Sequence, residues 1–330
     1  MIKNILITGG AGYIGSHIAE ILTKNKKNIY IVDDLSTGFK DLINKKTLFY
    51  NLNILKTTKL RKIILENKID SVIHLAASLS IGTGEKYPKF YYKNNVLGTK
   101  SLLKACQNSC VKNFIFSSTA AVYKDGQNLV SEKSNIYPKS VYGKTKLAAE
   151  REIILSCKKN KINYAILRYF NVCGASPSGK IGLVNKGDHL FKNISTEIVK
   201  KNPSIKIYGN DYKTKDGTAI RDYIHVSDLA DIHKKVLTSI SKTLKSIIIN
   251  CGYGKGISVK EVVREFQEQS TKKINIQFQS RRIGDMEMIV ANNKKLKNII
   301  KWKPKFNSLS LIVKSCISWD FKNRNKVFKN

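Results

Sequence analysis

The sequence lacks the features that would place the chain in a membrane or direct it out of the cell. No apolar run approaches the roughly 20 residues that a membrane-spanning helix needs. Met1 is followed almost at once by the strand-like run Ile5-Leu6-Ile7, which leaves no room for a signal peptide. We therefore expect no membrane association and a cytoplasmic location.

Cysteine is scarce and has no metal-binding pattern. The chain has six cysteines, and none belongs to a Cys-x-x-Cys pair or to a Cys/His cluster with zinc spacing: Cys106, Cys110, Cys157, Cys173, Cys251 and Cys316. We therefore expect no metal site. Reduced, buried thiols in the cytosol fit this usage best.

Acidic residues and arginine are also few, whereas lysine is abundant. The net charge is +35, with 59 lysines and arginines against 24 acidic residues, and only eight of the 59 are arginine. The lysines are scattered without a basic arm or stripe. Nucleic-acid recognition favours clustered arginine forks and aromatic stacking platforms. We therefore expect no nucleic-acid partner, and a positive field that attracts anionic small molecules instead.

The first half of the chain alternates between strand-like and helical segments. With 330 residues and 42% apolar content, the chain can bury a full core, and we expect it to divide into two domains. Ile14, Ile18 and Ile21 have helical spacing. Strand-like runs flank such segments, at residues 3–8, 28–33, 71–75, 113–117 and 163–168. This alternation predicts an α/β fold with a doubly wound parallel Rossmann sheet, covered by helices on both faces.

The alternation of strand-like and helical segments becomes less regular after about residue 170. A loop rich in Gly, Ser and Pro occupies residues 174–187, and shorter strand candidates follow at 204–208, 246–250 and 274–278. We therefore predict a Rossmann domain over residues 1–170 and a second, smaller α/β domain over 171–330. Part of 219–243 is expected to pack back on the first domain.

Three glycines follow the first predicted strand and open a helix. The spacing Gly9-x-x-Gly12-x-x-Gly15 permits a tight turn, close approach of a pyrophosphate, and close packing of helix on strand. Asp33 ends the second strand, where its carboxylate can accept hydrogen bonds from a ribose 2′-hydroxyl and would repel a 2′-phosphate. The segment therefore predicts NAD rather than NADP. The alternative is a tight βα turn without a ligand.

A tyrosine and a lysine lie four residues apart, on one face of a predicted helix. Tyr142 titrates near pH ~10 in its ordinary state, so work as a base at neutral pH needs a lower pKa. The charge of Lys146 can lower it, and we expect this pair to act as proton acceptor for a hydroxyl that is being oxidised. Ser117-Ser118-Thr119 closes the preceding strand. The alternative is a solvated pair on a helix surface.

The glycine turn and the Tyr-x-x-x-Lys pair belong to an ordered series of motifs. In chain order the series is Gly9–His17, Asp33–Gly38, His74–Ala77, Tyr91–Asn95, Gly98-Thr99, Phe116–Tyr123, Tyr142–Lys146, Arg168–Val172, Tyr208–Tyr212, Asp216–Thr218, Arg221–Val226 and Arg281–Asp285. With this series the chain resembles the extended short-chain dehydrogenase/reductase superfamily over nearly its whole length. Within that superfamily it resembles the UDP-glucose 4-epimerases, as the motifs of the second half indicate.

The resemblance implies roles for the matching residues. Tyr142 would be the acid/base, Lys146 would hold the nicotinamide ribose and tune Tyr142, and Thr119 would share the proton of the sugar 4-hydroxyl. The other implied cofactor contacts are Gly9, Gly12, Tyr13, Ile14, Gly15, Asp33, Asn94 and Ser117. The implied substrate contacts, besides Thr119, are Asn171, Tyr208, Arg221, Arg282 and Asp285.

The chemistry of the implied substrate residues agrees with a nucleotide sugar. Two arginines suit a diphosphate, and Asp285 can accept hydrogen bonds from ribose hydroxyls. A salt bridge between Arg221 and Asp222 is the alternative for that arginine, and capping of local backbone is the alternative for Asn171.

The residues after Thr119 indicate the reaction class. By resemblance, related dehydratases and decarboxylases carry acidic residues where this chain has Ala120 and Ala121. Without a carboxylate, no general acid is available there to expel a 6-hydroxyl. The resemblance therefore implies an NAD-dependent isomerase that interconverts UDP-galactose and UDP-glucose, by oxidation and re-reduction at C4 through a 4-keto intermediate.

Other activities stay open. One is the same chemistry on UDP-N-acetylglucosamine or a UDP-pentose, and Ile289, at a position that helps to decide sugar size in the family, predicts slower turnover of N-acetylated sugars. A sugar-nucleotide dehydratase and a catalytically silent NAD-binding protein are less favoured. The resemblance also implies a homodimer, and a sugar-nucleotide-binding role for residues 171–330.

The chain departs from its relatives at several positions. Val141 precedes Tyr142 where many relatives have proline, and Lys124 stands where relatives usually have glycine. Asn53 replaces an acidic residue often found near the adenine, and Leu79 replaces a lysine that some epimerases have near the cofactor. None of these changes removes a catalytic group.

Overall fold

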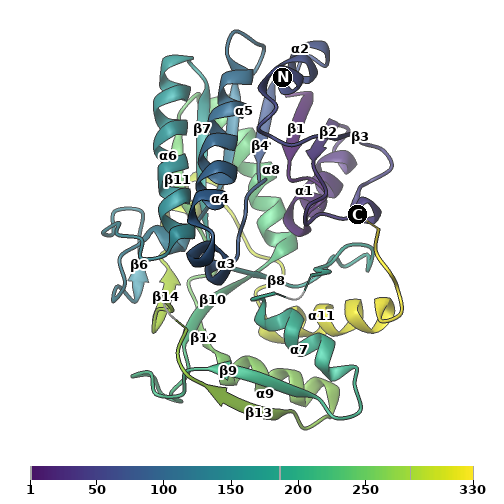
Figure 1. Ribbon diagram of the computed structural model, residues 1–330, viewed down its shortest axis with the longest axis vertical. Coiled ribbons are helices and arrows are strands. Elements are labelled where there is room, and N and C mark those ends of the chain that lie inside the picture. The colour runs from purple at the N-terminus through teal and green to yellow at the C-terminus, as the bar shows by residue number, and fades with distance from the viewer. Residues whose placement is uncertain (1, 186, 283, 330) are drawn as a thin grey trace.

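The computed structural model describes residues 2–185, 187–282 and 284–329. Met1, and Ile283 within the Arg281–Asp285 motif, lie outside these ranges. A seven-stranded parallel sheet forms the centre of the fold, and the predicted α/β class with a Rossmann sheet is confirmed (Figure 1). Its strands, from edge to edge, are β11 (Ile247–Cys251), β7 (Asn163–Tyr169), β5 (Asn113–Thr119), β4 (Ser71–His74), β1 (Asn4–Thr8), β2 (Asn28–Asp33) and β3 (Leu48–Asn51).

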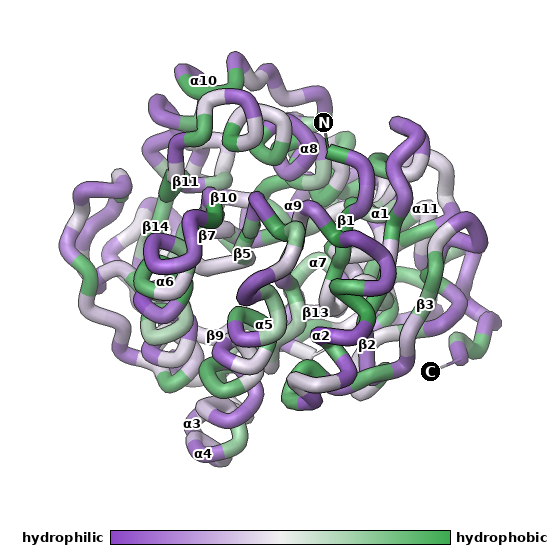
Figure 2. The backbone as a smooth tube through the Cα atoms, turned by 90° about the horizontal axis from the view of Figure 1, so that it is seen from above, coloured by the Kyte–Doolittle hydropathy of each residue, from purple (hydrophilic) through white to green (hydrophobic). Residues whose placement is uncertain are grey.

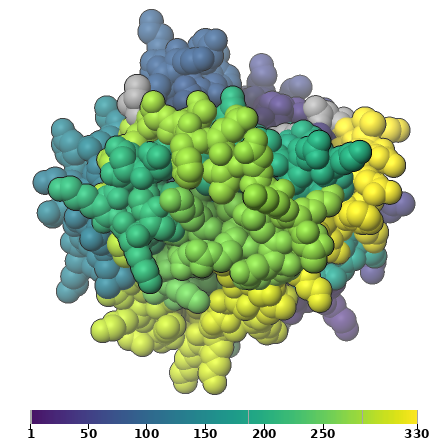
Figure 3. Space-filling model, turned by 90° about the horizontal axis from the view of Figure 1, so that it is seen from below, coloured from purple at the N-terminus to yellow at the C-terminus, as the bar shows by residue number. Residues whose placement is uncertain are grey.

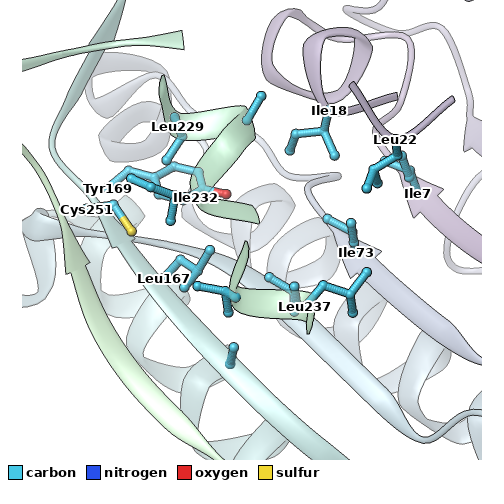
Figure 4. Close-up of a cluster of buried hydrophobic side chains, with 14 of the residues drawn as sticks. Ile7, Ile18, Leu22, Ile73, Leu167, Tyr169, Leu229, Ile232, Leu237 and Cys251 are labelled. Carbon is cyan, nitrogen blue, oxygen red and sulfur yellow. The ribbon is translucent and has the colours of Figure 1, made fainter. Parts of the chain in front are cut away.

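Helices cover both faces of this sheet because successive strand residues point to opposite sides. Ile5 and Ile7 pack into one core, whereas Leu6 packs into the other. Figure 4 shows the first core, in which side chains of the sheet meet α1 and α8. The first face is covered by α1 (Tyr13–Lys24), α8 (Val226–Thr243) and α10 (Lys294–Ile300), and the second by α2 (Thr57–Glu66), α5 (Gly98–Cys106) and α6 (Val141–Lys159).

Part of the second half of the chain belongs to this sheet. β11 pairs in parallel with β7, and Ile249 and Cys251 lie in the same buried cluster as Ile5. α8 contributes Leu229, Ile232, Val236, Leu237 and Ile240 to that cluster. The Rossmann sheet therefore includes residues from both sides of position 170.

A second, smaller unit lies below the sheet in Figure 1. It packs three helices on a two-stranded parallel sheet around its own core, which includes Phe191, Phe266 and Val313. Residues of the second half of the chain form the centre of the lower face (Figure 3). Its elements are α7 (Leu190–Ile198), β9 (Ser204–Tyr208), α9 (Val259–Ser270), β13 (Asn275–Gln279) and α11 (Leu309–Asn323).

Short strands connect the two units. β10 pairs with β8, β12 and β14, and β14 pairs with β6. Their bounds are β6 (Leu129–Val130), β8 (Asn171–Cys173), β10 (Ile220–His225), β12 (Gly256–Ser258) and β14 (Met288–Ala291). The remaining helices are α3 (Ile81–Lys86), α4 (Pro88–Tyr91), the 3₁₀ turns Lys40–Leu42 and Ala120–Val122, and a π-helical turn over Tyr92–Leu97.

Hydrophilic residues lie mostly in the peripheral loops and on the outer sides of helices (Figure 2). Five cysteines are buried and Cys110 is exposed. None of the helices in the described ranges combines the length and apolarity that crossing a bilayer would need.

Candidate active site

The turn between β1 and α1 brings the three predicted glycines together. Gly9 has a φ of 74°, and a Cβ at this position would lie 2.6 Å from the Ala76 nitrogen. A Cβ on Gly15 would lie 2.3 Å from the Gly9 oxygen, so a side chain at either site would push helix and strand apart. Gly12 is the N-cap of α1 and leaves the N–H groups of the first turn open to an anion. This geometry fits the pyrophosphate of a dinucleotide.

The side chains of Tyr13 and Ile14, the two residues after Gly12, make different contacts. The Tyr13 hydroxyl donates to the Gly174 oxygen at 2.6 Å, and the Ile14 side chain packs against the core beneath α1. Their backbone N–H groups lie in the first turn of α1. A cofactor contact at these two positions would therefore use the backbone.

Asp33 lies at the end of β2, beside the glycine turn. Its carboxylate accepts hydrogen bonds from the Ala11 nitrogen at 3.0 Å and the Leu35 nitrogen at 2.9 Å. Burial raises the pKa of Asp33 above its ordinary value, and these two hydrogen bonds oppose the rise. Asn53 donates to Asp34 at 2.6 Å, so the residue that replaces an acid in this chain orients a neighbouring carboxylate.

Lys146 is buried at the centre of the site, with a side chain only 1% exposed. Its Nζ donates to the Ser117 oxygen at 2.7 Å, lies 3.5 Å from the Ser117 Oγ and stands 4.7 Å from the Phe116 ring centroid. Burial lowers the pKa of Lys146 to about 7, and the charge of Glu150 opposes this effect. The structure therefore brings together the predicted residues Lys146 and Ser117.

Tyr142 lies in the first turn of α6, against the end of β5. A Cβ on Gly143 would lie 2.5 Å from the Ala121 oxygen, so this turn of the helix rests directly on the segment after Thr119. Burial raises the pKa of Tyr142 to about 12, while its hydrogen bond with Thr119 opposes the rise. The net shift is upward because burial outweighs the effect of Thr119, whereas the sequence led us to expect a lowering by Lys146.

Side chains of the π-helical turn over Tyr92–Leu97 form hydrogen bonds with both the loop after β4 and helix α6. Asn94, a predicted cofactor contact, donates to the Ser78 Oγ at 2.9 Å. Asn95 binds both the nitrogen and the oxygen of Ser78, and its Nδ2 also donates to the Thr145 Oγ1 at 3.1 Å. π-turns inside helices are frequent at functional sites. Here the turn fixes the loop against the helix that carries Tyr142.

Arg221 and Asp285, both predicted substrate contacts, form a loose ion pair. The Arg221 Nη2 lies 3.6 Å from the Asp285 Oδ1, and the Nη1 donates to the Ile220 oxygen at 2.9 Å. Asp222 is fully buried and accepts hydrogen bonds from three backbone nitrogens, those of Tyr253, Gly254 and Ala291. The alternative of an Arg221–Asp222 salt bridge is therefore wrong.

Arg282 stacks on Tyr208, which ends β9, with its guanidinium carbon 3.9 Å from the ring centroid. Its Nη1 lies 3.6 Å from the Asp188 Oδ1, and Asp188 also accepts from the Ser80 Oγ at 2.9 Å. Asn171 begins β8 opposite Tyr223 of β10, and its side chain is exposed. The roles of these residues in substrate binding stay predictions.

The sequence did not single out a buried polar network behind the predicted catalytic residues. Arg168 forms two hydrogen bonds with the Glu150 carboxylate, at 3.0 and 2.7 Å, and donates to the Tyr123 hydroxyl at 3.1 Å. Ser118 also donates to Glu150, and the Tyr123 hydroxyl donates to Asn250 at 2.6 Å. Glu150 lies four residues after Lys146, and this spacing is the signal that could have identified it.

Comparisons with known proteins agree with this geometry. A model of the NAD dependent epimerase/dehydratase family matches residues 5–252. A UDP-glucose 4-epimerase of Azospirillum brasilense is 37% identical over 318 residues, which are 96% of this chain and 91% of that protein.

Solved structures are similar over nearly the whole chain. A UDP-glucose 4-epimerase from Brucella ovis in complex with NAD has a TM-score of 0.90 at 33% identity, covering 96% of this chain and 97% of that one. One from Bifidobacterium longum in complex with NAD+ and UDP has a TM-score of 0.91 at 29% identity, covering 98% and 100%. The resemblance to the UDP-glucose 4-epimerases is confirmed, and the chain belongs to the NAD dependent epimerase/dehydratase family.

Proposed function

We propose that this chain is a UDP-glucose 4-epimerase that interconverts UDP-galactose and UDP-glucose with NAD as its cofactor. The observation that carries the proposal is the meeting of Tyr142, Thr119 and Lys146 at the end of β5, in the same sheet whose first βα turn fits a pyrophosphate. A proton acceptor and a dinucleotide site on one sheet edge are what oxidation of a sugar hydroxyl requires. The UDP-glucose 4-epimerases of Azospirillum brasilense and Brucella ovis each match 96% of this chain.

Each residue has a distinct part in this proposal. Bound NAD would supply the group that takes the hydride from C4 and returns it. Tyr142, whose pKa Thr119 lowers against the larger effect of burial, would take the proton of the 4-hydroxyl and later give it back. Lys146 lies beside Ser117, where its protonated form would stabilise the phenolate of Tyr142.

The protein would bind the UDP part of the substrate tightly and the sugar loosely. Arg221 and Arg282 would bind the diphosphate, and Asp285 the uridine ribose. Each arginine lies 3.6 Å from a carboxylate, an anionic partner of the kind that a diphosphate also offers. The 4-keto sugar could then turn about its phosphate link and present its other face.

The segment after Thr119 favours epimerisation over elimination. Ala120 is buried, and Ala121 offers its carbonyl to the close approach of Gly143. Neither residue can protonate a leaving hydroxyl. Loss of water from the sugar therefore has no general acid at this place.

Several finer predictions belong to the same proposal. A homodimer is supported by large exposed hydrophobic side chains on neighbouring elements of one side, Phe90, Tyr92, Leu97 and Leu155. A cytoplasmic location, a part in galactose metabolism and the domain limits 1–170 and 171–330 also stay predictions.

One assay tests the proposed function. Purified protein is given UDP-galactose, and the product is followed by a coupled reaction for UDP-glucose and by mass spectrometry. We expect UDP-glucose of unchanged mass. A product lighter by one water would make the protein a dehydratase. Faster turnover of UDP-N-acetylgalactosamine or of a UDP-pentose would instead favour one of the other 4-epimerases.

A further inference from the structure

The first residue of α6 makes a contact that a proline could not make. The Val141 nitrogen donates to the Glu85 Oε1 at 2.8 Å. A proline at this position would have no N–H to donate. The donor lies next to Tyr142, and Glu85 accepts from it.

This donor is one of four backbone N–H groups that the start of a helix leaves without a partner. Ser140 satisfies another, because its Oγ accepts from the Gly143 nitrogen at 3.1 Å. A carboxylate at a helix N-terminus is also favoured by the helix dipole. Glu85 and Ser140 together hold the first turn of α6, in which Tyr142 is the second residue.

Glu85 lies on the short helix α3, which is held in place by contacts with Tyr91. Ser80 caps α3, and its carbonyl accepts from the Tyr91 hydroxyl at 2.6 Å. A Cβ on Gly84 would lie 3.2 Å from the Tyr91 ring, so α3 rests directly on that buried side chain. The helix that carries Glu85 is therefore fixed to the body of the molecule through Tyr91.

We propose that Glu85 is a positioning residue that acts through the amide of Val141. It holds the first turn of α6 so that Tyr142 stays within reach of Thr119. The inference rests on the proposed epimerase function, in which Tyr142 exchanges the proton of the 4-hydroxyl. Glu85 itself touches neither of the two catalytic side chains in this scheme, and acts through Val141.

The backbone at this point allows a direct test with proline. Val141 is the first helical residue, where proline is favoured because its missing N–H would be unpaired in any case. Ser140 has φ −79° and ψ 151°, in the extended region that the residue before a proline prefers. Val141→Pro therefore removes the donor without distorting the chain.

The experiment compares Glu85→Ala, Glu85→Gln and Val141→Pro, together with the double variant Glu85→Ala/Val141→Pro. kcat and KM are measured with UDP-galactose on NAD-saturated enzyme. We expect Glu85→Ala to lower kcat about fivefold, the size of one solvent-accessible hydrogen bond, with little change in KM. Glu85→Gln keeps an acceptor oxygen and should stay within about twofold of wild type, a smaller change than loss of that bond.

The double variant gives the decisive comparison. In the Val141→Pro background, Glu85→Ala should have no further effect on kcat, because the donor is already gone. Glu66→Ala is the matched control, since this exposed glutamate of α2 pairs with Lys62. A Glu85→Ala enzyme with wild-type kcat, or a loss that persists beside Val141→Pro, would overturn the proposal.

Hydrogen exchange separates this inference from the proposed function. If wild type fails to epimerise UDP-galactose, the proposed function falls, but exchange of the Val141 amide can still be measured. We expect faster exchange of that amide in Glu85→Ala than in wild type or Glu66→Ala. Equal exchange in all three proteins would show that the contact does not hold the helix.

Discussion

Replacement of Lys146 by methionine should stabilise the ligand-free protein while it removes activity. Lys146 is buried, and its Nζ faces the Ser117 oxygen and the Phe116 ring rather than a carboxylate in direct contact. Burial lowers its pKa from 10.5 to about 7. A lysine with a lowered pKa binds fewer protons in the folded state than in the unfolded state, so it costs stability wherever the unfolded chain is protonated.

The size of this cost follows from the two pKa values. A folded pKa of about 7 against an ordinary 10.5 gives a cost of about 4 kcal/mol at pH 7 and about 2 kcal/mol at pH 9. The cost shrinks as the pH rises toward 10.5, because the lysine is then neutral in both states. Methionine has a similar length and carries no charge, so Lys146→Met removes the cost.

The assay is thermal unfolding of both proteins after bound nucleotide has been removed, at pH 7, 8 and 9. We expect a higher Tm for Lys146→Met at pH 7, by roughly 1.5 °C for each kcal/mol gained in a chain of 330 residues, and a smaller gain at pH 9. Lys144→Met, at an exposed position of the same helix, should change Tm little at either pH. A Lys146→Met protein that is less stable than wild type, or a gain that does not vary with pH, would refute the reasoning.

Four further results are expected. Tyr142→Phe should keep the fold and bound NAD but lose kcat by roughly 10²–10⁴, as expected for a positioned acid/base; activity within tenfold of wild type would contradict this role. Nucleotide released by acid should be NAD(H), and recovery of NADP would contradict the role of Asp33. Because Ile289 is a buried branched side chain, kcat/KM for UDP-N-acetylgalactosamine should be below that for UDP-galactose, and an equal value would be evidence against it. Burial lowers the pKa of His17 and of His233 to about 4, so the unfolded state binds more protons than the folded state below pH 6.5. Each histidine should therefore lower the free energy of unfolding by about 2 kcal/mol at pH 5. A Tm that is unchanged between pH 7 and pH 5 would exclude this loss of stability.

Most strands of the Rossmann sheet could be predicted because their pattern is local, but β3 was not predicted. β2, and β9 of the second unit, have the predicted bounds, and β1, β4, β5 and β7 differ by one or two residues at an end. β10 was missed because its sequence places Arg221 and Asp222 side by side, which is unusual for a strand. Asp222 is tolerated there because three backbone nitrogens from later segments donate to it. No local pattern contains those partners.

In the candidate site too, some features follow from local sequence patterns and others depend on residues far apart in the chain. The glycine turn and the Tyr142–Lys146 spacing follow from rules about turns and helix faces, so the sequence could place them. The pKa of Tyr142 depends on how deeply the folded chain buries the phenol, and burial raises it where the sequence led us to expect a lowering by Lys146. The contact between Glu85 and Val141 joins residues 56 positions apart, and only the folded chain brings them together.

The position of β11 at the edge of the sheet has a consequence for synthesis of the protein. A ribosome releases the chain from its N-terminus, yet the sheet is complete only when residues 247–251 have emerged and paired with β7. Until α8 arrives, the apolar face formed by Ile5, Ile7 and Leu167 has no cover from that helix. A nascent chain of the first 170 residues would therefore expose an apolar surface that is prone to aggregation, and chaperones bind such surfaces while translation continues.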